Sequence, residues 1–136
     1  MQSLFKIAQA HGGHATGNRP DELVYSVVES GKSKAAIFVI GEAIRRRMHW
    51  IYGDRIDILF DPAMAEGQLI RVKDGGWKMC GRDEAKNAGP GRVRIVLRPE
   101  FNLPEVESQV ALAVELTENT IVFAFPTKYR KQVKVS

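Results

Sequence analysis

The sequence predicts a mainly β (α+β) fold: a small β-barrel of short strands with one short helix. Several segments alternate apolar with polar residues, or are β-branched and aromatic throughout, which is typical of strands. Turns that contain Gly, Asp or Asn separate these segments at short intervals. Only residues 41–50 show the spacing of a helix with one apolar face.

Size and composition suit one globular domain. The chain has 136 residues, of which 44% are hydrophobic and 26% charged. We expect a single barrel domain over residues 23–126, preceded by an N-terminal arm or short helix plus loop (1–22) and followed by a basic tail (127–136). No apolar run approaches the roughly 18 residues that cross a bilayer, so no membrane partner is expected. A single cysteine, Cys80, predicts a reducing, cytoplasmic setting.

The first part of the chain contains four expected strands and the helix. The strands are predicted over residues 23–29, 35–40, 55–60 and 68–72. In the helix, Ile44, Met48 and Ile51 share one face, while Arg45 and Arg46 are expected to point mostly the other way.

The second part begins after a polar, Gly-rich stretch, residues 80–91, which we interpret as a linker. Strands are predicted over residues 92–98, 110–116 and 120–125. Between the first two of these, Pro99 and Pro104 bracket a short irregular piece.

A weak internal repeat relates the two parts. Residues 35–72 run strand, short helical piece, strand, strand, and residues 92–125 run strand, short Pro-bounded piece, strand, strand. This pattern predicts a pseudo-twofold barrel whose halves cover about 23–79 and 92–126. The alternative is an ordinary β-meander, which shows some of the same order.

Residues 31–73 carry two motifs. The stretch 41–46, Gly-Glu-Ala-Ile-Arg-Arg, fits the pattern P-x-x-[IL]-R with Gly41 at the proline position. Residues 50–56 fit a turn of the form hydrophobic, x, x, Gly-Asp, x, hydrophobic. In both motifs the segment resembles the AbrB/SpoVT swapped-hairpin DNA-binding module. Residues 53–61 and 69–77 also loosely resemble small phage-encoded proteins of unknown function.

The AbrB/SpoVT resemblance implies binding to double-stranded DNA through arginines, in a homodimer or a pseudo-dimeric monomer. The net charge of +4 is compatible with a polyanionic partner. Long cationic side chains on one surface are what phosphate contact requires. The predicted DNA-binding residues are Lys32, Lys34, Arg45, Arg46, Arg47, Arg92, Arg94 and Arg98. The alternative for each is a solvated charged surface.

The residues give little support for a metal site, a phosphate-binding loop or a catalytic site. His11 and His14 make at most half of a metal site, so no metal is predicted. The triplet 31–33, Gly-Lys-Ser, lacks the first glycine of a phosphate-binding loop and precedes a strand. No nucleophile and base can be paired, and Cys80 is interpreted as a bystander thiol. We therefore expect neither catalysis nor a cofactor.

Two functions remain open from the sequence. The first is a DNA-binding protein, a transcriptional regulator that contacts DNA through the basic residues of an AbrB-like barrel. The alternative is a phage-type protein-binding inhibitor of a host or defence protein, without catalysis.

Overall fold

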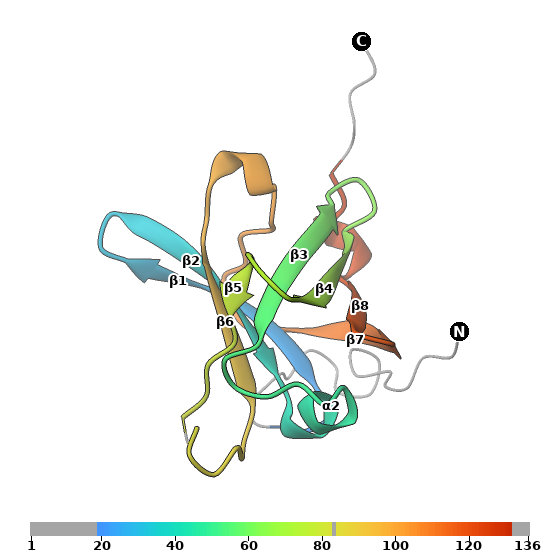
Figure 1. The fold of residues 1–136 in the computed structure, drawn as a ribbon. Coiled ribbons are helices and arrows are strands. Elements are labelled where there is room, and N and C mark those ends of the chain that lie inside the picture. Colours follow the sequence, from blue (N-terminus) through green and yellow to red (C-terminus); the bar gives the residue numbers. More distant parts are fainter. Residues whose placement is uncertain (1–18, 83, 132–136) are drawn as a thin grey trace.

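Eight antiparallel strands form a nearly closed barrel in this computed structural model, which confirms the predicted fold class (Figure 1). The structure describes residues 19–82 and 84–131, so most of the predicted N-terminal arm and residues 132–136 of the predicted tail lie outside the described residues. The strands are β1 (Leu23–Ser30), β2 (Ser33–Ile40), β3 (Arg55–Asp61), β4 (Glu66–Val72), β5 (Trp77–Lys78), β6 (Gly91–Val96), β7 (Val110–Thr117) and β8 (Thr120–Ala124). The helical elements are α2 (Glu42–Arg47) and the 3₁₀ turns η1 (Pro99–Phe101) and η2 (Thr127–Tyr129). None of the described helices is long and apolar enough to span a membrane.

The strands follow the order β5-β3-β4-β8-β7-β1-β2-β6 around the barrel. The first and last strands meet only at an isolated bridge between Cys80 and Arg92, which nearly closes the cylinder. All these strands come from one chain. The barrel therefore needs no strand from a second copy to close.

This order has an internal twofold pattern. Exchanging β1 with β5, β2 with β6, β3 with β7 and β4 with β8 returns the same set of neighbours. Each half thus contains two strands, a helical piece and a hairpin. It pairs with the other half through β1–β7, β2–β6, β3–β5 and β4–β8. The predicted repeat is present in this topology. In this pattern β5, which lies within residues 23–79, corresponds to β1, so the second half of the topology begins at β5.

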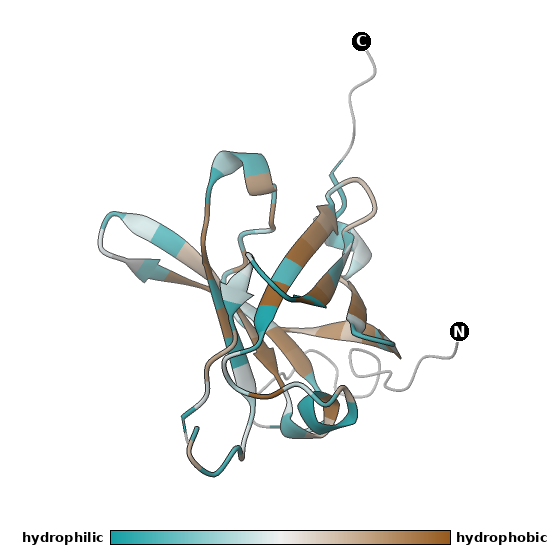
Figure 2. Cartoon of the chain, viewed as in Figure 1, coloured by the Kyte–Doolittle hydropathy of each residue, from teal (hydrophilic) through white to brown (hydrophobic). Residues whose placement is uncertain are grey.

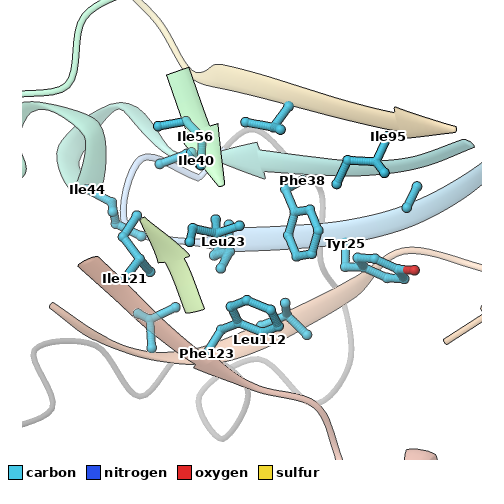
Figure 3. Close-up of a cluster of buried hydrophobic side chains, with 14 of the residues drawn as sticks. Leu23, Tyr25, Phe38, Ile40, Ile44, Ile56, Ile95, Leu112, Ile121 and Phe123 are labelled. Carbon is cyan, nitrogen blue, oxygen red and sulfur yellow. The ribbon is translucent and has the colours of Figure 1, made fainter. Parts of the chain in front are cut away.

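The core lies where the inward faces of the strands meet. Along β2, Phe38 and Ile40 are fully buried and lie opposite Tyr25 and Leu23 of β1. Figure 3 shows these side chains with others from β6, β7 and β8 around one centre. Along β3 polar and apolar residues alternate only as far as Ile58, and Figure 2 shows polar and apolar bands on that strand.

The helix is shorter than predicted. It ends at Arg47, and His49 has a positive φ of 58°, which turns the chain out of the helical direction. Ile51, expected on the apolar helix face, is consequently 54% exposed. Ile44 and Met48 are buried as predicted.

Residues 80–91 are not a free linker. The Tyr52 hydroxyl donates to the carbonyl of Ala88 at 2.6 Å, and the Gly89 amide donates to the Glu42 carboxylate at 2.9 Å. The segment is thereby fastened to α2 and to the turn that follows it. The linker interpretation was wrong because glycine content does not disclose such long-range hydrogen bonds.

Candidate nucleic-acid interface

The eight predicted cations fall in three places. Lys32 and Lys34 lie at the β1–β2 hairpin, and Arg45, Arg46 and Arg47 lie on α2. Arg92 and Arg94 project from β6, and Arg98 follows that strand. The structure does not bring all eight onto one surface.

Arg45 is a structural residue. It is 1% exposed, although the sequence predicted that it points away from the core. Its guanidinium donates to the carbonyls of Gly89 (2.9 Å), Trp50 (3.0 Å) and Asn87 (2.8 Å) and to Asn87 Oδ1 (3.0 Å). It also lies 4.6 Å from the centre of the Tyr52 ring. Arg45 is buried because the 84–90 segment covers this side of α2, so the predicted DNA contact by Arg45 does not fit its position.

The next two arginines of α2 are exposed. Arg46 forms an i,i+4 ion pair with Glu42, with 2.9 Å between Nη2 and Oε2. The pKa of Glu42 is lowered, first by the hydrogen bond from the Gly89 amide and then by Arg46. Arg47 is exposed and forms no ion pair with a described residue. α2 therefore offers one free and one paired cation.

A denser group of cations lies on the outer side of β3, β5 and β6. On β6, Val93 and Ile95 point into the core, and Arg92 and Arg94 point outward. On β5, Lys78 is exposed between half-buried Trp77 and buried Met79. Arg55 of β3 is exposed and lies directly opposite Lys78 in the strand register.

We call Arg55, Lys78, Arg92 and Arg94 the cationic face. None of the four forms an ion pair with any residue that the structure describes. Arg55 donates one hydrogen bond, from Nε to the Gly75 carbonyl at 2.9 Å, which leaves its terminal nitrogens open to solvent. Like charges directly opposite on neighbouring strands are destabilising. The arrangement is thus unfavourable in the free protein and suited to an anion.

A basic hollow lies beyond the end of β6. It has a volume of about 570 Å³, and four cations from three segments of the chain line it: Lys32, Lys34, Arg98 and Lys131. One carboxylate shares it, because Lys34 Nζ donates to Glu105 at 2.5 Å, and this hydrogen bond raises the pKa of Lys34. The hollow continues the line of outward arginines along β6.

Arg55, Lys78 and Lys131 were not among the predicted residues. Arg55 is a single cation in its predicted strand, and Lys78 lies in a two-residue strand with no visible period. The register Arg55↔Lys78 depends on a pairing between β3 and β5 that no local pattern discloses.

The remaining candidates stay apart. His11 and His14 lie outside the described residues, and His49 is exposed. Residues 19–82 and 84–131 contain no group of three side chains suited to hold a metal ion. Cys80 is a free, exposed thiol.

Comparison with models of known protein families, with curated proteins and with solved structures found no match to this chain.

Proposed function

We propose that this protein binds double-stranded DNA through the cationic face and the basic hollow. The observation that carries the proposal is the set of outward cations on the adjacent strands β3, β5 and β6. Two of these cations, Arg55 and Lys78, lie opposite each other, and neither forms an ion pair with a described residue. A phosphate backbone supplies the missing negative charge.

The dimensions of this surface suit a duplex. From Arg92 to Arg98 the chain advances about 20 Å, and β3 and β6 are separated by two strand spacings, about 10 Å. This area covers several phosphates, because duplex DNA carries one charge per roughly 1.7 Å of its axis. Binding of this kind is dominated by contacts to phosphate, which position the protein without reading the sequence.

The resemblance of residues 31–73 to the AbrB/SpoVT module also supports DNA binding. The segment runs strand, helix, strand, strand, which is the order that the resemblance implies. In our proposal, however, the DNA-contacting arginines are on β6, since Arg45 of the matching motif is buried. A role as a transcriptional regulator rests on the resemblance alone.

Fluorescence anisotropy with a labelled duplex of about 20 base pairs, across a salt series, tests the proposal. The double variant Arg92→Ser with Arg94→Ser removes two phosphate contacts. We expect its slope of log affinity against log salt to fall by about two, with at least a tenfold loss of affinity at low salt.

The matched control is Arg46→Ser with Arg47→Ser, which removes the same charge from α2. We expect this variant to keep most of the affinity. An equal loss in both variants would assign binding to net charge rather than to the cationic face. A protein that ignores duplex DNA even at low salt would disprove the proposed function.

A further inference from the structure

A second surface lies between β3 and η1, where the barrel wall is open. Here a groove of about 300 Å³ is bounded on one side by Ile58 and Phe60 of β3. On the other side it is bounded by Ile95, Phe101 and Leu103. Trp77 and Phe101 meet edge to face at its end, with ring centres 5.9 Å apart. The walls are thus mainly aromatic and aliphatic.

One wall of the groove is a free strand edge. β5 pairs with β3 only at Arg55 and Ile56. The Met79 amide donates to the Asp54 carbonyl on this same edge, so the strand alternation turns the backbone groups of Ile58 and Phe60 toward the groove. No strand of the described chain pairs with them there. The Ile58 amide is held instead by the neighbouring Asp57 carboxylate at 2.9 Å.

The corresponding seam in the first half is better filled. There α2 is the counterpart of η1, and its Ile44 is fully buried. The amides of Ala43 and Ile44 both lie within hydrogen-bond distance of the Pro20 carbonyl, just before β1. η1 is a turn of only three residues, and its Phe101 stays half-buried. The internal twofold pattern is therefore broken at the groove.

The charge of the groove is opposite to that of the whole protein. Asp57 and Glu100 are the ionisable residues that line it, and Asp61 ends the same strand. The chain as a whole has a net charge of +4, so these two carboxylates form a local acidic site on a basic protein. The occupant that fits is therefore basic as well as apolar.

We propose that the groove binds an extended segment of a partner protein, which adds a strand to the free edge of β3. The segment runs antiparallel to β3, in line with β5. It places apolar side chains at alternate positions in the groove and a lysine or arginine between them, near Asp57 and Glu100. Strand addition of this kind draws affinity from backbone hydrogen bonds and specificity from pockets for alternate side chains.

Two blocked heptapeptides test this proposal, one alternating valine with lysine and the other valine with glutamate. We expect the lysine peptide to bind saturably, with a dissociation constant below about 1 mM. The amides of Ile58 and Phe60 should shift in NMR spectra and gain protection from hydrogen exchange. Non-specific attraction to a protein of charge +4 favours the glutamate peptide. A preference for the lysine peptide therefore reports the carboxylates of the groove.

Glu100→Lys should weaken the lysine peptide about tenfold and reverse the preference. Glu107→Lys makes the same charge change at an exposed position that does not line the groove, and should leave binding unchanged. Arg92→Ser with Arg94→Ser should also leave it unchanged, so failure of DNA binding and failure of this proposal are separable. Preference for the glutamate peptide, or shifts that avoid Ile58 and Phe60, would overturn the proposal.

Discussion

At the scale of single residues, three consecutive arginines have three different roles. Arg45 donates four hydrogen bonds inside the protein, Arg46 pairs with Glu42, and Arg47 is exposed. Helical spacing predicted the apolar face correctly at Ile44, but it could not place Arg45. The segment that covers Arg45 lies more than forty positions along the chain, at Asn87 and Gly89.

Replacing Arg45 by alanine tests this structural role. The change takes a donor from the buried Trp50 carbonyl and from the part-buried Asn87 carbonyl, so we expect the free energy of unfolding to fall by about 3 kcal/mol. Urea denaturation followed by circular dichroism measures it. The exposed neighbour provides the control, and Arg47→Ala should change the free energy by less than about 0.5 kcal/mol. Similar small effects of both substitutions would show that the Arg45 contacts contribute little.

At the scale of elements, the strands with a clear period were predictable and the short one was not. The alternation over residues 55–60 and 92–98 indicated the inward positions of Ile56, Val93 and Ile95, because one face of each strand packs on the core. β5 has two residues, too few for any period, and its pairing with β3 brings Lys78 to Arg55. This is why sequence reasoning found the β6 arginines but missed half of the cationic face.

The contact between α2 and the 84–90 segment depends on pH through Glu42. Its pKa is lowered in the folded protein, mainly by the Gly89 amide and then by Arg46. Because the folded protein favours the ionised carboxylate, this group contributes its full stabilisation when the pH is above the ordinary carboxyl pKa of 4.5. The stabilisation is lost as the pH falls through the lower, folded value.

The variant Glu42→Gln isolates this effect. At pH 7 it should melt at a lower temperature than the wild type, and the gap should narrow between pH 4.5 and pH 3. Thermal melts of the wild type and the variant, at pH 7 and at pH 3, give the comparison. The other acidic groups are the same in both proteins, so their effect cancels in the difference between the two melting temperatures. A gap that stays constant or widens toward pH 3 would contradict the proposed linkage.

At the scale of the whole molecule, the two halves interlock and neither forms a sheet of its own. In the first half, the β1–β2 hairpin and the β3–β4 hairpin do not pair with each other, because β7 and β8 lie between them. The repeat in the sequence anticipated this symmetry for the strands after residue 35. It missed the correspondence of β1 with β5, because β1 has eight residues and β5 only two, so the two strands share no sequence pattern.

Cutting the chain between Val72 and Trp77 tests the interlocking. Each fragment then holds only two-stranded units, which are marginal in water, so we expect each alone to lack dispersed NMR signals. Mixing the two fragments should restore the folded spectrum, because β2–β6 and β4–β8 pairing becomes available. A first fragment that folds alone would show that the hairpins are self-sufficient.

The interlocking also sets the order of events during synthesis. β1 is synthesised early, but its neighbour β7 begins only at Val110. Likewise β4 cannot pair with β8 until the residues from Thr120 onward have been synthesised. The residues up to β8 must leave the ribosome before the wall between these strands can form. Distant pairings of this kind slow folding and leave strand edges exposed meanwhile. The nascent protein therefore passes through a stage in which both hairpins are open to wrong partners, and its last strands end that stage.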